Sequence, residues 1–322
     1  MRRTTDDIAV NEQNTIRKIA FLGTPGFAVP SLKMLIRKGY EIEVFTQPDR
    51  PKDRGHALAA PEVKLAALEA GLPVHQFERI RREEGVNALR AFAPDLMVTA
   101  AFGQLLSEEN LSIPKYGCIN VHGSLLPAYR GASPIQTAII KGEKVTGVTT
   151  MLTSLGMDTG DILLKKETEI GENETYGELS ERLAVLGAEL LLKTLDLLEN
   201  GTLTRVPQDP EAATVCHLLT KEDAHIDCAK SAKTVHDLVR GTNPWPCAYA
   251  LLDGQPLKLF ETRRTEASFP DAPGTLRERD GKLYLCCADG ALEVLSLQAS
   301  GKKRMDAATF LRGCPLDGKT VC

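Results

Sequence analysis

Hydrophobic and polar positions follow two periods along the first two hundred residues. Apolar runs of strand length occur at 18–23, 41–46, 95–103, 117–122, 145–152 and 162–170, with a shorter one at 71–74. Helical spacing of apolar residues occurs between them, at 28–38, 61–70, 83–92, 134–141 and 176–198. Strands that alternate with helices form mostly parallel sheets covered on both faces, so this region is predicted to be a doubly wound α/β domain.

The pattern changes after residue 200. Residues 201–224 contain Pro207 and Pro210 and have no clear period, which predicts a linker. A short helix is predicted at 235–240, and short alternating runs separated by glycines follow at 248–252, 255–261, 282–286 and 291–297. Such runs predict a small β-barrel. The expected organisation is an N-terminal extension at 1–17, a first domain at 18–203, a linker at 204–224 and a second domain at 225–322.

Composition narrows the class of protein. The 322 residues are 43% hydrophobic and 25% charged, which is typical of globular proteins. No apolar run approaches the roughly 18 residues of a membrane span, and the polar N-terminus lacks the apolar core of a secretory signal. The eight cysteines form no C-x-x-C pair, so no metal site is predicted and a cytoplasmic protein with reduced thiols is expected. With a net charge of −4, a polyanion would have to bind to local basic patches.

The candidate chemistry is at the end of the strand at 117–122. Asn120 and His122 are two residues apart, so both side chains leave the same face of the strand. Ligands of open α/β sheets bind at the carboxyl ends of the strands. Asp158, in a glycine-flanked turn after another strand, is placed to join them, although it could equally be only a turn residue. An amide and a charged imidazole would be two donors for an oxyanion, as acyl transfer requires. Ser124 lacks a nucleophile elbow, so the nucleophile is expected on a substrate, such as an amine.

Two other segments have alternative interpretations. Gly23-Thr24-Pro25-Gly26 resembles a nucleotide-binding turn but is not G-x-G-x-x-G, which favours a tight strand-to-helix turn over a dinucleotide site. Residues 46–58 contain Arg50, Lys52 and Arg54 and are too charged for a simple connection. They are either a solvated loop or a basic loop that gains order on a polyanion.

Three motifs carry a resemblance to a known family. They are Asn120-x-His122-x-Ser124-Leu125-Leu126-Pro127, Arg130-Gly131-Ala132-x-Pro134-Ile135-Gln136 and Met157-Asp158-Thr159-Gly160-Asp161. With them the chain resembles the folate-dependent formyltransferases over about 18–310. The branch that acts on methionyl-tRNA is indicated by Phe45-Thr46-Gln47-Pro48-Asp49-Arg50-Pro51, Gly71-Leu72-Pro73-Val74, Asn243-Pro244-Trp245-Pro246, Ser296-Leu297-Gln298 and Gly301-Lys302-Lys303.

The resemblance implies a fold and an activity. The fold would be a Rossmann-like domain with a C-terminal OB-like barrel. The reaction would move a formyl group from 10-formyl-tetrahydrofolate to the α-amine of methionyl initiator tRNA. Asn120 and His122 would stabilise the oxyanion, and Asp158 would hold His122 and assist proton transfer. No metal is implied, and a monomer is expected.

The resemblance also implies two binding surfaces. The folate pocket would be lined by Ser124, Leu125, Leu126 and Pro127 and by Phe102 and Gly103 in the 100–104 region. The tRNA would be contacted by Arg50, Lys52 and Arg54 of the basic loop and by Lys302 and Lys303 of the barrel.

Two departures from the family pattern stand out. Arg54-Gly55 is followed by His56-Ala57 where two lysines are usual, so the loop carries less charge. Ile226-Asp227 is followed by Cys228 where a tryptophan is common.

Three alternatives remain open at this stage. A formyltransferase for a small amine, such as an amino-sugar nucleotide, would not need the basic loop. A dinucleotide-binding oxidoreductase would need a better phosphate cradle than Gly23–Gly26. An RNA-binding protein without catalysis would not need Asn120, His122 and Asp158.

Overall fold

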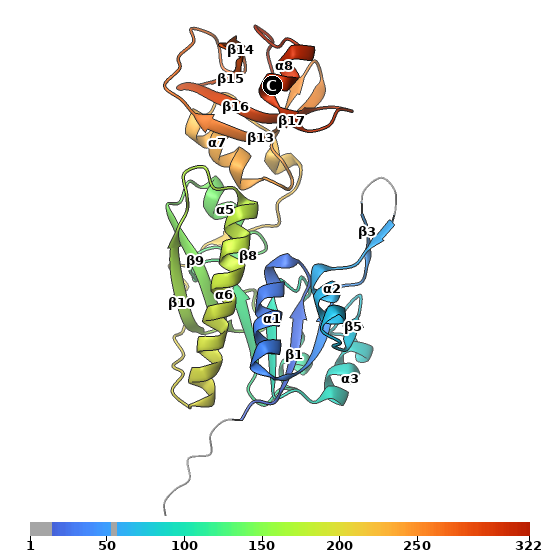
Figure 1. Cartoon of the computed structure of the whole chain (residues 1–322). Helices are drawn as coiled ribbons and strands as arrows, with labels where there is room; N and C mark the ends of the chain where they lie inside the picture. Colours follow the sequence, from blue (N-terminus) through green and yellow to red (C-terminus); the bar gives the residue numbers. More distant parts are fainter. Residues whose placement is uncertain (1–14, 53–56) are drawn as a thin grey trace, which may run out of the picture.

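The computed structural model describes residues 15–52 and 57–322, and it divides into an α/β domain and a smaller β-rich domain (Figure 1). The first domain contains a seven-stranded sheet in the order β10-β9-β7-β6-β1-β2-β5. Five neighbouring strands are parallel, and β9 runs antiparallel to both β7 and β10. The predicted mostly parallel, Rossmann-like sheet is therefore confirmed. Its strands are β1 (Lys18–Gly23), β2 (Glu41–Thr46), β5 (Val74–Gln76), β6 (Leu96–Ala100), β7 (Cys118–His122), β9 (Val145–Leu152) and β10 (Ile162–Glu169).

Helices cover both faces of this sheet because successive side chains of its central strands point to opposite sides. Ile19 and Phe21 of β1 pack with α1 (Val29–Lys38), α2 (Glu62–Glu69) and α6 (Tyr176–Glu199). Ala20 and Leu22 pack on the other side with α3 (Glu83–Phe92) and α4 (Glu108–Leu111). The short η1 (Gly26–Ala28) precedes α1, and α5 (Pro134–Ile140) lies near the second domain. The sequence predicted the longer helices of this domain within one residue of their observed ends.

A two-stranded hairpin projects from the first domain (Figure 1). It consists of β3 (Arg50–Lys52) paired antiparallel with β4 (Ala57–Ala59). The sequence predicted an irregular loop over 46–58. The paired stem was missed because its strands are only three residues long and one contains Pro51, so no period can be recognised. Residues 53–56 lie outside the described part of the chain.

The second domain contains a six-stranded antiparallel sheet. Its strands are β12 (Tyr249–Leu252), β13 (Gln255–Arg264), β14 (Leu276–Arg279), β15 (Lys282–Cys287), β16 (Gly290–Ala299) and β17 (Met305–Asp306). The path of neighbours is β12-β13-β16-β15-β14, with β17 on β16. Two helices pack on it, α7 (Ala232–Gly241) and α8 (Ala307–Gly313). The sequence missed β14, which has three charged residues among four, and α8, which is only seven residues long.

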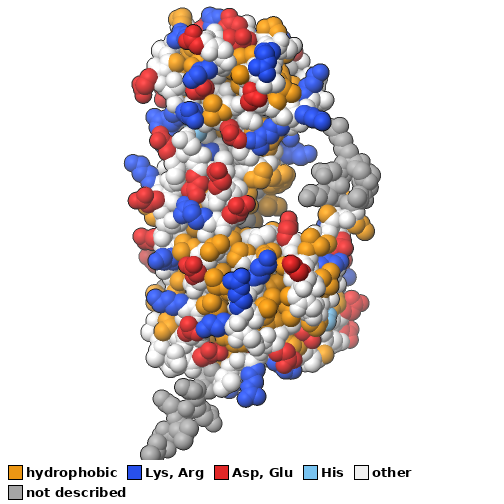
Figure 2. All heavy atoms as spheres, in the orientation of Figure 1, with side chains coloured by type: hydrophobic (Ala, Val, Ile, Leu, Met, Phe, Trp, Pro, Cys, Tyr) orange, Lys and Arg blue, Asp and Glu red, His pale blue; other side chains and the backbone are white. Residues whose placement is uncertain are grey.

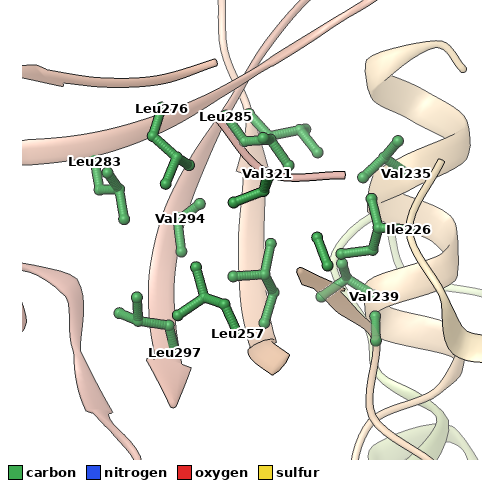
Figure 3. Packing of buried hydrophobic residues seen from close by; sticks show 14 of the residues in the cluster. Ile226, Val235, Val239, Leu257, Leu276, Leu283, Leu285, Val294, Leu297 and Val321 are labelled. Atoms are coloured by element: carbon green, nitrogen blue, oxygen red, sulfur yellow. The ribbon is translucent and has the colours of Figure 1, made fainter. Parts of the chain in front are cut away.

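One apolar cluster holds the second domain together (Figure 3). Val235 and Val239 of α7 face Leu257, Leu285 and Val294 of the sheet. Each of these side chains is at most 2% exposed. Truncating a fully buried leucine such as Leu285 removes both transfer free energy and packing, so this cluster is the main source of the domain's stability.

Helix α7 also attaches the second domain to the first. The Arg240 Nε donates to Asp237 Oδ1 at 2.8 Å, and both side chains are under 10% exposed. The Arg240 Nη1 reaches across to the carbonyls of Gly171 and Glu174 at 3.2 and 3.1 Å. Nearby, His236 Nε2 contacts the Glu172 carbonyl at 3.2 Å, and burial lowers the pKa of this histidine. The buried Asp237–Arg240 pair at this boundary therefore holds the two domains in a fixed relative orientation.

We expect Asp237→Ala to lower the free energy of unfolding by about 3 kcal/mol, because it leaves the Arg240 guanidinium buried without a carboxylate. Urea unfolding followed by the fluorescence of Trp245, the single tryptophan, measures this at the domain boundary. The control is Glu172→Ala, which removes the exposed Arg264–Glu172 pair across the same boundary. Its effect should stay under about 0.5 kcal/mol. Equal losses of unfolding free energy in the two variants would show that the buried pair stabilises the domain boundary no more than the exposed pair does.

Candidate active site

Strand β7 presents Asn120 and His122 at the carboxyl end of the parallel strands. It lies between β6 and β9, with Asn120 in register with Thr99 and His122 in register with Thr149. The hydroxyl of Thr99 donates to Asn120 Oδ1 at 2.9 Å. With its oxygen bonded to Thr99, the half-buried Asn120 presents its Nδ2 amino group as the end available to a ligand.

Both nitrogens of the His122 ring face acceptors. Its Nε2 lies 3.0 Å from the carbonyl oxygen of Tyr129, and its Nδ1 lies 3.7 Å from Asp158 Oδ2. The ring is only 6% exposed. The second distance is longer than a direct hydrogen bond, so the contact with the carboxylate is electrostatic and leaves the Nδ1 side open to another acceptor. The charged imidazolium is the form that can donate on both sides.

Asp158 lies in the turn between β9 and β10. Its backbone is left-handed, with a φ of 52°. Its Oδ2 accepts the backbone N–H of Gly131 at 2.8 Å, and its side chain is 17% exposed. A left-handed aspartate needs support from its surroundings. Here the Gly131 N–H holds the carboxylate beside His122, so the structure brings these two of the three predicted catalytic side chains into contact.

None of the described residues around this site has a side chain placed to act as the nucleophile. The Ser124 hydroxyl is fully buried and donates to the Ala128 carbonyl at 2.6 Å. Burial raises the pKa of the Cys118 thiol to about 11 and also raises the pKa of Cys216. A thiol with a raised pKa is inert near neutral pH. The arrangement therefore fits a reaction in which the attacking group belongs to a substrate.

The residues predicted for a folate pocket differ in accessibility. Ser124 and Leu126 are fully buried, whereas Leu125 and Pro127 are half-buried. The Ser124 carbonyl and the Leu126 N–H are both bonded to Thr149 Oγ1, at 2.7 and 3.1 Å, which fixes this segment on β9. Leu125 and Pro127 are therefore the two side chains of this segment that a ligand can reach.

The second predicted folate segment follows β6. Phe102 is 5% exposed, and Gly103 is exposed with a φ of 77°. The Gln47 side chain donates to both of their carbonyls at 3.2 Å. A β-carbon at Gly103 would lie 2.4 Å from Gln47 Nε2. The turn after β6 therefore presents backbone groups, and not large side chains, at the carboxyl ends of the strands.

The predicted basic residues are spread over two elements. Arg50 makes a two-pronged ion pair with Glu78, at 2.8 and 3.3 Å, on an exposed surface. Lys302 and Lys303 are exposed in the turn after β16. The side chain of Lys52 and all of Arg54 lie outside the described residues. Figure 2 shows Lys and Arg side chains along the edge of the second domain that faces the β3–β4 hairpin.

Sequence reasoning missed several residues that shape the site. Thr99 orients Asn120, and Tyr129, with a left-handed φ of 59°, presents its carbonyl to His122. Gln208 bonds to the backbone of the turn that carries Asp158. In the sequence, Arg130 and Gly131 are marked only as part of a family motif. No local signal marks Gln208, because its role depends on contacts between distant segments.

Other candidate features of the described residues lie away from this site. Two surface depressions are found at the amino ends of the parallel strands, one beside Asp95 and the other beside Tyr116 and Arg205. The described residues contain no group of three His, Cys, Asp or Glu side chains that could hold a metal ion. None of the described helices is long and apolar enough to cross a membrane.

Comparison with known families matches both domains to one class of enzyme. Residues 17–195 match the family model described as formyl transferase, and residues 218–315 match the model described as formyl transferase, C-terminal domain. Both matched regions thus place the chain in the class of two-domain formyltransferases.

Curated relatives narrow the class further. A methionyl-tRNA formyltransferase from Ruminiclostridium cellulolyticum is 49% identical over 93% of this chain and 97% of its own length. Those from Acetivibrio thermocellus and Pelobacter propionicus are also 49% identical, over 92% and 95% of this chain and 96% of their own lengths. This chain belongs to the methionyl-tRNA formyltransferase family.

Solved structures share the fold at lower identity. HypX from Aquifex aeolicus, in complex with tetrahydrofolic acid, is 18% identical with a TM-score of 0.65. The match covers 95% of this chain and 50% of HypX, so this chain spans about half of that protein. The sugar 3N-formyl transferase WlaRD is 19% identical with a TM-score of 0.66, over 90% of this chain and all of WlaRD.

Proposed function

We propose that this protein transfers a formyl group from 10-formyl-tetrahydrofolate to the α-amino group of methionyl initiator tRNA, for translation initiation. The observation that carries the proposal is 49% identity with methionyl-tRNA formyltransferases over nearly the whole chain. The contact between His122 and Asp158 beside the oriented Asn120 amide supplies the chemistry that this reaction needs.

The three side chains divide the work of acyl transfer. The co-substrate supplies an activated formyl carbonyl. The Asn120 Nδ2 and the His122 imidazolium donate to the carbonyl oxygen as negative charge develops on it. Asp158 stabilises the charged imidazole and accepts a proton from the attacking amine as a general base. When the tetrahedral intermediate collapses, the bond between the formyl carbon and N10 of the folate breaks, the proton passes from Asp158 to N10, and tetrahydrofolate leaves as the neutral amine. These roles fit the donors present, because the Asn120 oxygen is already occupied by Thr99 and only its amino group remains.

The folate would lie along the carboxyl end of the sheet. Leu125 and Pro127 offer half-buried apolar surface, and the 100–104 turn offers backbone groups. Ser124, Leu126 and Phe102 are buried, and they would support the pocket wall rather than contact the ligand. Together these residues make up the proposed binding pocket, with no metal.

The tRNA would lie between the hairpin and the second domain. Lys302 and Lys303 are exposed in the turn after β16, and the sequence segment 46–58 contains Arg50, Lys52 and Arg54. We also propose that the second domain (225–322) is an OB-like barrel. Its chain end supports closure, because the Cys322 carbonyl accepts from Leu251 N of β12 and Val321 N donates to the Gly274 carbonyl before β14. The last residues thus bridge both edges of the sheet.

Further parts of the proposal concern organisation. The catalytic domain would be residues 18–203, after an N-terminal extension at 1–17 and before the linker at 204–224. The protein would act as a monomer in the cytoplasm, where initiator tRNA is used.

The proposal is tested with a choice of acceptors. The protein is mixed with formyl-labelled donor and, in separate reactions, methionyl initiator tRNA, deacylated tRNA or an amino-sugar nucleotide. We expect label only on the charged tRNA. Transfer to the sugar nucleotide alone would replace the proposal with the small-amine alternative, which is supported by distant fold likeness to solved structures such as WlaRD.

The basic loop gives a separate prediction. We expect Arg54→Ala to raise KM for the tRNA severalfold and leave KM for the folate donor unchanged. Each lost phosphate contact should also lower the slope of log K against log salt by about one. Arg50→Ala is the comparison, and we expect a smaller effect because Arg50 is already paired with Glu78. An equal rise of both KM values in Arg54→Ala would contradict the assignment of the loop.

A further inference from the structure

The segment between the domains is attached to the active site along much of its length. We call residues 206–216 the strap. At its start, Val206 and Ile162 exchange backbone hydrogen bonds at 2.9 Å. At its end, β11 (Val215–Cys216) pairs in parallel with β8 (Arg130–Gly131). The second domain begins beyond the short η2 (Glu222–Ala224). The strap therefore contacts the chain just after the Asp158 turn, at Ile162, and just after Tyr129, at β8. Asp158 and Tyr129 are the residues that face the His122 ring.

Gln208 makes the central contact of the strap. Its Nε2 donates to the carbonyls of Asp158 and Gly160, at 2.8 and 2.7 Å. Its Oε1 accepts from Nε and Nη2 of Arg130, at 3.0 and 2.8 Å. Both donors and both acceptor sites of this amide are thus in use. A half-buried side chain that is fully bonded between two loops holds those loops at a fixed separation.

The two loops joined by Gln208 are the ones that hold the catalytic carboxylate. Gly131, next to Arg130, donates its N–H to Asp158 Oδ2 at 2.8 Å. Asp158 itself has a left-handed backbone. This conformation costs free energy and persists only where contacts with the surrounding structure hold it. Gln208 bonds the carbonyl of the same aspartate, so it acts on the position of the carboxylate beside His122.

We propose that Gln208 is a positioning residue for formyl transfer, which holds Asp158 against the Arg130–Gly131 turn so that the carboxylate stays at His122 Nδ1. The inference rests on the proposed function. A displacement of about 1 Å at a reacting group can cost up to about 100-fold in rate. The strap is thereby part of the active site as well as a connection between domains.

The kinetic test compares two substitutions with a control in the strap. Gln208→Ala removes all four bonds, and Gln208→Glu keeps the acceptor for Arg130 but loses the donors to Asp158 and Gly160. We expect both to lower kcat by about 10- to 100-fold with less than about a threefold change in either KM. Glu211→Ala, an exposed neighbour, should match wild type. Near wild-type turnover of Gln208→Glu would overturn the proposal, because it would leave Gln208 only an anchor for Arg130.

A double-mutant cycle decides whether Gln208 acts through Asp158. In the Asp158→Asn background, Gln208→Ala should cost less than about threefold in kcat, because the group it positions is already gone. The same 10- to 100-fold cost in both backgrounds would show an independent structural effect and overturn the proposal.

Amide exchange gives a readout that does not depend on activity. The Gly131 N–H is bonded to the Asp158 carboxylate, so its hydrogen exchange should quicken about tenfold or more in Gln208→Ala and remain unchanged in Glu211→Ala. Unchanged exchange in Gln208→Ala would refute the positioning role even if wild type formylated a different acceptor. Wild-type acceptor specificity tests the proposed function separately.

Discussion

Asn120→Ala should lower kcat by on the order of 100-fold, the loss typical of one oxyanion donor. The amide is positioned for this because Thr99 binds its oxygen and leaves only the Nδ2 amino group available to a substrate. The interaction forms fully only as charge develops on the carbonyl oxygen. The loss should therefore fall on kcat, with KM for the folate donor nearly unchanged.

Two further variants separate the donor from its support. Asn120→Asp keeps the shape of the side chain but replaces the amino group by an oxygen, so it should lose at least as much kcat as alanine. Thr99→Val keeps the donor and removes only the bond that orients it, so it should lose about tenfold or less. Steady-state kinetics with charged initiator tRNA measures all three. Full turnover in Asn120→Ala would remove the oxyanion role.

Asp158→Asn should have a larger effect, a loss in kcat on the order of 1,000-fold, within the range for a general acid–base group. Asparagine can still accept the Gly131 N–H, so the turn should keep its shape. It cannot carry the negative charge that faces His122 Nδ1 at 3.7 Å, and it cannot take a proton from the amine.

The matched control lies in the same turn. Asp161→Asn removes a carboxylate of equal size whose side chain makes no hydrogen bond with the described residues, and it should stay within about twofold of wild type. Single-turnover measurements separate the chemical step from product release. Retention of more than about a tenth of wild-type turnover by Asp158→Asn would contradict the catalytic role assigned to this carboxylate.

The site could be predicted from the sequence only where its geometry is local. Asn120 and His122 share a face because side chains on a strand repeat every two residues, and that holds wherever the strand lies. Their position at the carboxyl end of a parallel sheet followed from the alternation of strands and helices. Asp158 was a candidate through its turn and through the family motif. Its contact with His122 is a long-range contact that no local period encodes.

The contacts of the strap, by contrast, could not be predicted from the sequence. Pro207, Pro210 and the lack of a period predicted a linker, because a strand of two residues such as β11 leaves no pattern. In the structure, Thr214 Oγ1 accepts the Tyr129 N–H at 2.8 Å, and Gln208 bonds the Asp158 turn. These bonds fix the carbonyl that faces His122 Nε2 and the carboxylate that faces Nδ1.

By itself the sequence determined the mostly parallel α/β class of the first domain, the β-rich character of the second, the order of the main strands and helices, and the amide and imidazole side by side on β7. Hydrophobic period and strand geometry act over a few residues, so they can be read without coordinates. Only the tertiary structure decided which acceptors surround the His122 ring and how the strap meets them. Those contacts join β7, the turn after β9 and the strap, and their distances depend on how the whole sheet packs.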